Sequence, residues 1–156
     1  MDLSNSPIST EQRACLADGL SRALADSYTL YLKTHNYHWN VEGPQFHALH
    51  TLFEEQYTDL AQAVDEIAER IRALGHRAPG SYTEFAKLAA VREDTGHPAA
   101  KDMARQLAED QETLGVTLRT VIKTARDADD AATEDLMVAR LKVHEKNAWM
   151  LRAQLG

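Results

Sequence analysis

Apolar residues recur at every third or fourth position in four long stretches of the chain, which is the spacing of amphipathic helices. The first predicted helix begins after Ser9 or Thr10, either of which is a suitable N-cap, and runs to about residue 39. The second spans about residues 45–74 and has the most regular pattern. Its apolar positions are Phe46, Leu49, Phe53, Tyr57, Leu60, Val64, Ile67, Ile71 and Leu74. Steps of three and four throughout predict a helix of a bundle.

A broken stretch at residues 75–98 follows the second helix, and glycine and proline residues interrupt it at both ends. Between these breaks the pattern predicts a short helix within residues 81–91. Ser81 opens this helix, with Glu84 as its capping-box partner.

The third long helix is predicted at about residues 99–128 and the fourth at about residues 134–155, with a short acidic turn between them. The connection between the second and third helices is much longer than the other two. We therefore predict an all-α fold: a ferritin-like four-helix bundle with a short extra helix in the connection between helices two and three. In this prediction the four long helices alternate up-down-up-down.

Length and composition favour a single domain over residues 1–156, with residues 1–8 as a flexible N-terminal tail. The formal net charge of −7 disfavours a nucleic-acid binder. Cys15 is the single cysteine, so no intrachain disulfide can form and we expect a reducing compartment, the cytoplasm. We expect Cys15 to be a small packed residue. The chain shows neither a secretory signal nor an apolar stretch long enough to span a membrane.

Metal-ligating side chains share one face of the second predicted helix. With His50 as the origin of a helical wheel, Glu54 falls at about 40°, Asp65 at about 60° and Glu69 at about 100°. Glu54 and Asp65 are nevertheless roughly 16 Å apart along the helix axis, whereas such ligands bind a metal at about 2 Å. The face therefore carries two half-sites: a histidine half-site (His50, Glu54) and a carboxylate half-site (Asp65, Glu69).

A two-fold axis near residues 59–60 would unite the two half-sites. If two copies of this helix packed antiparallel, the histidine half-site of one chain would meet the carboxylate half-site of the other, forming two equivalent sites. His38, just before the turn between the first two helices, could join the histidine half-site. Two imidazoles and three carboxylates suit iron, manganese or zinc rather than a metal that prefers thiolates.

Simpler interpretations exist for each residue. A polar stripe beside an apolar one is usually a solvated boundary, and His50 with Glu54 is also an ordinary i,i+4 pair. The remaining histidines are interpreted as hydrogen-bonded or surface residues; these are His35, His47, His76, His97 and His144. No Glu-x-x-His pair occurs in the sequence, so the intrachain di-iron site of ordinary ferritin-like bundles is not predicted.

Residues 35–75, HNYHWNVEGPQFHALHTLFEEQYTDLAQAVDEIAERIRALG, closely resemble the signature of the Dps family, the mini-ferritins named as DNA-binding proteins from starved cells. The resemblance rests on His-Trp-Asn-Val-x-Gly, a Phe, Leu-His, and Asp-x-x-Ala-Glu-Arg at the correct separation. The short helix in the middle connection and the C-terminal helix ending near Trp149 extend it over nearly the whole chain.

The resemblance implies a hollow dodecamer with intersubunit ferroxidase centres. His38, His50 and Glu54 match the family's ligands from one subunit, and Asp65 and Glu69 match those from its two-fold mate. Glu54 stands where many members have Asp. The implied activity is oxidation of ferrous iron, with hydrogen peroxide in most members and dioxygen as the other oxidant, and storage of ferric oxyhydroxide that protects against oxidative damage.

Two further roles follow from the resemblance. Trp39 matches a tryptophan close to the centre, where it donates electrons or quenches radicals; the alternative is packing between helices. The turn before the fourth helix matches the region that lines three-fold iron-entry pores, and Asp130 and Asp135 are our pore candidates. Carboxylates at a helix N-terminus also have a simpler electrostatic explanation.

Two alternative functions remain at this stage. One is a nucleoid protein that protects DNA by coating it; the N-terminus, with Arg13 against Asp2 and Glu11, lacks a basic tail, so we expect weak DNA binding. The other is a bundle that binds zinc or manganese at the same ligands without redox turnover.

Overall fold

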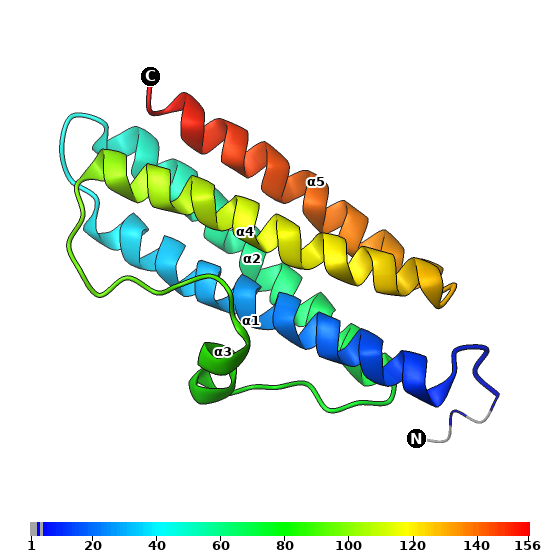
Figure 1. Cartoon of the computed structure of the whole chain (residues 1–156). Coiled ribbons are helices and arrows are strands. Elements are labelled where there is room, and N and C mark those ends of the chain that lie inside the picture. Colours follow the sequence, from blue (N-terminus) through cyan, green and yellow to red (C-terminus); the bar gives the residue numbers. More distant parts are fainter. Residues whose placement is uncertain (1–2, 4) are drawn as a thin grey trace.

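The computed structural model describes residue 3 and residues 5–156; residues 1, 2 and 4 of the predicted tail lie outside the described residues. The five helices are α1 (Thr10–Asn40), α2 (Phe46–Ala73), α3 (Tyr82–Leu88), α4 (Ala100–Asp127) and α5 (Ala131–Ala153). The part of the chain that is described contains no strand. The predicted all-α bundle, with its short helix in the middle connection, is confirmed (Figure 1).

The predicted alternation of helix directions is wrong. Asp26 contacts Thr117, and Tyr37 contacts Gln106, so α1 and α4 are antiparallel. Because α1 is also antiparallel to α2, the helices α2 and α4 run in the same direction, as Figure 1 shows. The physical reason is the connection at residues 74–99, which contains α3. This connection runs along the length of the bundle, so α4 begins at the end opposite to the one where α2 ends.

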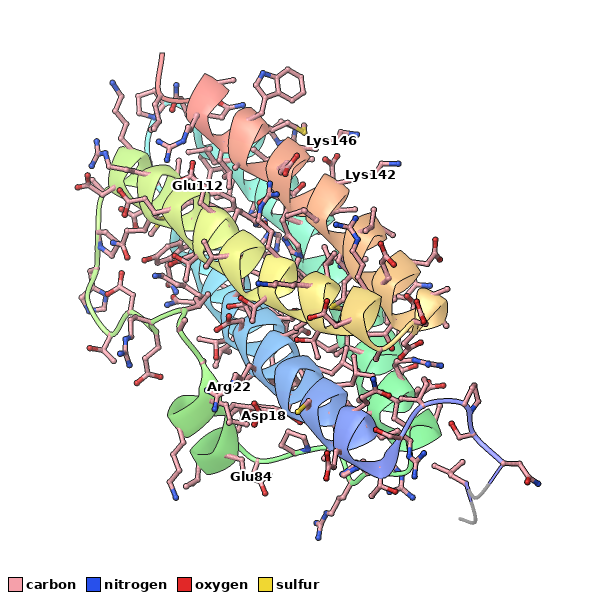
Figure 2. All side chains as sticks on the ribbon, turned by 45° about the vertical axis from the view of Figure 1, so that its right-hand side comes forward. Asp18, Arg22, Glu84, Glu112, Lys142 and Lys146 are labelled. Atoms are coloured by element: carbon pink, nitrogen blue, oxygen red, sulfur yellow. The ribbon has the colours of Figure 1, made fainter. Side chains whose placement is uncertain are left out.

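The predicted caps hold α1 and α3 at their N-termini. Ser9 caps α1 in a capping box with Gln12. The Ser81 side chain accepts a hydrogen bond from the Glu84 backbone N–H and so caps α3. The Glu84 carboxylate, labelled in Figure 2, accepts from the Gly80 N–H, and these bonds to backbone and Ser81 lower the pKa of Glu84.

The core lies between the four long helices. Its largest fully buried apolar side chains include Leu16, Leu20, Leu30, Tyr37, Leu49, Phe53, Leu60, Ile67, Ile71, Leu107, Leu114 and Leu118. α1 packs against α2 and α4, while α5 packs against α4 and α2. The α4/α5 pair is therefore on the side of the bundle opposite α1/α2. Cys15 is exposed, so the prediction that it is packed is wrong.

Three buried polar side chains on one face of α1 bind the crossing segment, residues 89–99 between α3 and α4. Asp26 accepts hydrogen bonds from the backbone N–H groups of residues 90 and 91, at 2.6 and 3.0 Å. Lys33 donates to the carbonyl of residue 92 at 2.9 Å, and Tyr37 donates to the Asp94 carboxylate. Burial and the hydrogen bond to the Asp94 carboxylate raise the pKa of Tyr37. The crossing is thus held by α1 itself.

A second buried polar group lies between α2, α4 and α5. His144 is 1% exposed; its Nδ1 lies 2.5 Å from Gln111 Oε1, and its Nε2 lies 3.2 Å from an Arg140 guanidinium nitrogen. Arg140 in turn forms an ion pair with Asp59 at 2.8 Å. Burial and the nearby Arg140 charge lower the pKa of His144 to about 3, so the imidazole is neutral in the fold.

This depressed pKa predicts a pH dependence of stability. Between a pKa of about 6.5 in the unfolded chain and about 3 in the fold, the unfolded chain binds more protons, so stability falls as pH falls through this window. The melting temperature should therefore decrease less in His144→Gln than in wild type between pH 7 and pH 4, whatever the stability of the variant at pH 7. Thermal unfolding of wild type, His144→Gln and the exposed-loop control His97→Gln checks this. Parallel losses in all three proteins would contradict it.

Candidate metal centre

His38 near the end of α1 and His50 near the start of α2 stack face to face, with ring centroids 3.8 Å apart and ring planes 13° apart. The Nδ1 atom of each ring lies 2.7 Å from the backbone carbonyl oxygen of the other residue. Because a carbonyl oxygen only accepts, each Nδ1 carries the proton, so in the neutral imidazole the lone pair is on Nε2. An imidazole oriented by a backbone carbonyl in this way is a typical metal ligand.

Aromatic rings and the helix hairpin hold this pair in place. The Phe46 ring stacks on His50 at 4.9 Å, and the Tyr57 ring meets His38 edge-on at 5.1 Å. His38 is only 8% exposed, whereas Glu54, one turn after His50, is exposed. The histidine half-site thus consists of two fixed imidazoles and an exposed carboxylate.

The carboxylate half-site lies further along α2. Asp65 and Glu69 are one turn apart and both exposed. Hydrogen bonding with Asp65 and the negative charge of that residue raise the pKa of Glu69, so the two carboxyl groups are neighbours on this face of α2. A divalent cation bound between them would remove this repulsion and supply the positive charge that the pair lacks.

Neither half-site is a complete metal site by itself. Among the described residues of a single chain, no group of three or more His, Cys, Asp or Glu side chains is placed to hold a metal ion. The chain therefore presents His38, His50 and Glu54 at one place and Asp65 and Glu69 at another. A second copy would be needed to bring the five together.

His35 packs against aromatic rings next to His38, a contact that its interpretation as a hydrogen-bonded or surface residue did not include. Its ring lies between Trp39, at 3.9 Å, and Tyr57, at 4.3 Å. Burial, followed by the charge of His38, lowers the pKa of His35. Trp39 is 59% exposed, so within its own chain it does not pack between helices. The i,i+4 spacing of His35 and Trp39 was the sequence signal for this contact.

The two pore candidates differ in their surroundings. Asp130 is 3% exposed; it caps α5 by accepting from the Thr133 N–H at 3.1 Å and forms an ion pair with Arg70 at 2.9 Å. Asp135, in the first turns of α5, is exposed. The Asp130 carboxylate is thus occupied within its own chain, and the geometry favours Asp135 of the two; the pore itself stays a prediction.

A partly apolar groove reaches Trp39, the residue after His38. It has a volume of about 560 Å³ and is formed by α1, α3 and the crossing segment. Trp39, Leu32 and Tyr82 line it and are 59%, 41% and 69% exposed. Exposed apolar side chains in such a groove are typical of an interaction surface.

Within the described part of the chain, no helix is both long and apolar enough to cross a membrane. The ferritin-like domain family matches residues 17–156. The chain is 40% identical over 137 residues to the DNA protection during starvation protein 2 of Bacillus anthracis, an alignment that covers 88% of this chain and 94% of that relative.

Solved structures agree with this match. The Dps protein of Vibrio cholerae O1, described as a member of a broad superfamily of ferritin-like diiron-carboxylate proteins, superposes with a TM-score of 0.91 at 35% identity, covering 96% of this chain and 94% of that one. The Dps protein of Bacillus brevis gives a TM-score of 0.91 at 36% identity, covering 96% and 100%. The chain therefore belongs to the Dps family of ferritin-like proteins and is an iron-binding mini-ferritin.

Proposed function

We propose that the protein is a ferroxidase whose centres form between two copies of the chain and whose product is stored in a hollow dodecamer. The observation that carries this proposal is the separation of the ligands on α2 into two half-sites, each incomplete within one chain. Two α2 helices related by a two-fold axis near their midpoint bring His38, His50 and Glu54 of one copy to the second copy's carboxylate half-site.

The ligand chemistry fits iron. Both imidazoles present a free Nε2, because their Nδ1 protons are held by backbone carbonyls. Carboxylate oxygens are hard donors that stabilise the ferric state, and five ligands shared by two ions leave coordination positions for an oxidant. Zinc or manganese would bind the same atoms without being the substrate of this reaction.

The groove that reaches Trp39 supports the same pairing. Trp39, Leu32 and Tyr82 expose apolar surface next to the half-sites, and a two-fold partner laid along α1 and α2 would cover it. Burial of aromatic side chains is a main source of affinity in such contacts. The centre and the interface that builds it thus share one side of the bundle.

The proposed reaction is a two-electron step. Two ferrous ions each give one electron to hydrogen peroxide; the O–O bond breaks and, with two protons, two water molecules form. Hydrolysis of the ferric ions then releases protons and deposits oxyhydroxide inside the shell. Peroxide consumed in this way is not available for radical formation by free ferrous iron. Dioxygen is the alternative oxidant.

Two residues have supporting roles in this proposal. Trp39, packed against His35 next to the His38 ring, would give an electron to a radical formed at the centre. Asp135, exposed in the first turns of α5, is the preferred pore residue for attracting ferrous ions.

The relatives are named for DNA protection, and the oxidation of ferrous iron by peroxide would provide such protection. The formal charge of −7 per chain repels phosphates, and a shell multiplies that charge. Removal of ferrous iron and peroxide would protect DNA without coating it. A DNA-coating protein would instead bind duplex DNA at physiological salt and show little iron oxidation.

The testing experiment loads the protein with ferrous iron without oxygen and then adds peroxide. Ferric absorbance should rise within seconds, two ferrous ions should be consumed per peroxide, and the ferric product should stay soluble. Free ferrous iron at the same concentration is the control, and a spin trap should report less hydroxyl radical with protein present. Binding of ferrous iron without faster oxidation than in the control would leave only the non-redox metal-binding alternative.

A further inference from the structure

Three half-buried tyrosines form a continuous line of ring contacts between α1 and α2. Tyr57 on α2 meets the His38 ring edge-on, with ring centroids 5.1 Å apart. Tyr57 also meets Tyr31 on α1 at 5.9 Å, and Tyr31 meets Tyr28, one turn earlier on α1, at 5.8 Å. These separations are those of aromatic rings in contact. The line therefore begins at the histidine half-site and continues along α1.

The other end of the line lies beside the carboxylate half-site. Tyr28 and Asp65 line the same groove of about 440 Å³ between α1, α2 and α3. Because α1 and α2 are antiparallel neighbours, the line follows α2 from the level of His50 towards Asp65 (Figure 1). Along the α2 axis these two residues are about 22 Å apart. The three phenol rings thus bridge the two half-sites of one chain.

Packing between helices explains why rings are present here, and it does not require that they be tyrosines. Four of the chain's five tyrosines nevertheless gather on this face, since Tyr82 on α3 also meets Tyr28, at 6.2 Å. A phenylalanine ring would pack as well, whereas a phenol can also lose an electron and a proton. The face that carries both half-sites is therefore rich in oxidisable side chains.

We propose that Tyr57, Tyr31 and Tyr28 carry electrons between the two ferroxidase centres of a two-fold dimer; the inference rests on the proposed function. In such a dimer the histidine half-site of each chain belongs to one centre, and the carboxylate half-site of the same chain belongs to the other. The tyrosine line of each chain therefore joins both centres. Electron transfer slows steeply with distance, and the rings divide a long path into short steps.

The path matters when each centre holds a single ferrous ion. One electron from that ion breaks the O–O bond of peroxide into hydroxide and a hydroxyl radical. On the proposed path Tyr57 adds a second electron and its phenol proton, and with one proton from solvent two water molecules form. Tyr31 and then Tyr28 reduce the phenoxyl radical, and the ferrous ion of the other centre reduces Tyr28, which takes a proton back. Two ferrous ions, one peroxide and two protons thus give two ferric ions and two water molecules.

The test is Tyr31→Phe, which keeps the ring and removes the oxidisable phenol. The protein is loaded without oxygen with one ferrous ion per centre, and one peroxide is then added for every two ferrous ions. Wild type should oxidise all of its iron. In the variant about half of the iron should stay ferrous, because the ion in the other centre can no longer supply the second electron. With two ferrous ions per centre, the variant and wild type should show the same rate and stoichiometry.

Electron paramagnetic resonance of freeze-quenched samples gives a readout that does not depend on iron turnover. In Tyr31→Phe the oxidising equivalent stays at the histidine half-site, so an organic radical should accumulate on Tyr57 or Trp39. Wild type should show much less of this signal. The matched control is Tyr37→Phe on the same helix, because the Tyr37 hydroxyl donates to Asp94 of the crossing segment and lies off the path. This control should behave as wild type in both measurements.

The possible results separate the two proposals. If Tyr31→Phe and wild type oxidised equal amounts of iron and gave equal radical signals at one ferrous ion per centre, the electron path would be overturned and the ferroxidase would stand. A wild type that oxidised iron no faster than free ferrous iron would overturn the ferroxidase and the path together. Circular dichroism checks that Tyr31→Phe folds, and Tyr28→Phe interrupts the same line and should leave about half of the iron ferrous as well.

Discussion

Replacing one ligand in either half-site should nearly abolish ferroxidation. Removing an outer-shell partner of a metal ligand typically costs roughly 10–100-fold in affinity or activity, and His50→Ala or Asp65→Ala removes a ligand itself, so each should cost more. The measurement is the initial rate of ferric absorbance after peroxide is added to the ferrous-loaded protein. His47→Ala and Glu66→Ala change exposed residues of the same helix and should keep the wild-type rate.

Mixing the two inactive variants provides the stronger form of this test. In a dimer of one His50→Ala chain and one Asp65→Ala chain, one centre receives an intact half from each chain and the other centre lacks both ligands. With random pairing of equal amounts, half of the dimers are mixed, so about a quarter of the wild-type rate should return. The two variants are unfolded and refolded together so that their chains pair at random.

The mixing result decides between a shared and an intrachain centre. If all ligands came from one chain, no combination of the two variants would contain a complete site, and the mixture would be as inactive as its components. The same outcome would remove the role assigned to the two-fold axis. Rates well above a quarter would show that chains of the two variants pair with each other in preference to their own kind.

Much of the fold could be predicted from periodicity alone. Steps of three and four along α2, and breaks rich in glycine and proline around it, placed its ends within one or two residues. The spacing of the candidate ligands along α2 was also predictable, because phase around a helix and distance along its axis follow from residue numbers; their role as half-sites stays a prediction. Neither prediction needed a contact between distant parts of the chain.

What could not be predicted depends on such contacts. The direction of α4 is set by a connection that spans the bundle. Asp26 binds the backbone of this connection at residues 90 and 91, which are 64 and 65 positions away in sequence. Asp130 was a pore candidate because it is acidic and lies in the turn that matches the family's pore region. Only the fold reveals that Arg70 and Thr133 already occupy its carboxylate. The paired Nδ1 bonds of His38 and His50 likewise need both backbones in place.

Asp26 is where loss of a single polar side chain should cost the most stability. Its carboxylate is 1% exposed and accepts from two backbone N–H groups and from the Thr117 hydroxyl at 2.6 Å. Asp26→Ala leaves these donors without a partner in the interior. Hydrogen bonds to a charged group are worth about 1.5–3 kcal/mol, and an unsatisfied buried group costs about 1–3 kcal/mol, so the loss should be about 3–5 kcal/mol.

Guanidinium unfolding at matched protein concentration measures this loss, since the stability of an oligomer depends on concentration. Asp26→Asn keeps an acceptor for the backbone and should recover part of it. The matched control is Asp18→Ala on the same helix. Asp18 forms an exposed pair with Arg22, and both side chains are labelled in Figure 2. Such a surface pair is worth at most about 1 kcal/mol.

Loss of the Asp26 hydrogen bonds should also loosen α3 and the residues that follow it. Asp26 holds the backbone just after α3, while the Phe85 ring of α3 stacks on Tyr28 of α1 at 5.0 Å. With the anchor removed, amide hydrogen exchange should accelerate in residues 82–92 more than in the centres of the four long helices. If Asp26→Ala matched Asp18→Ala in both stability and exchange, the crossing segment would have to be held by Lys33 and Tyr37 alone.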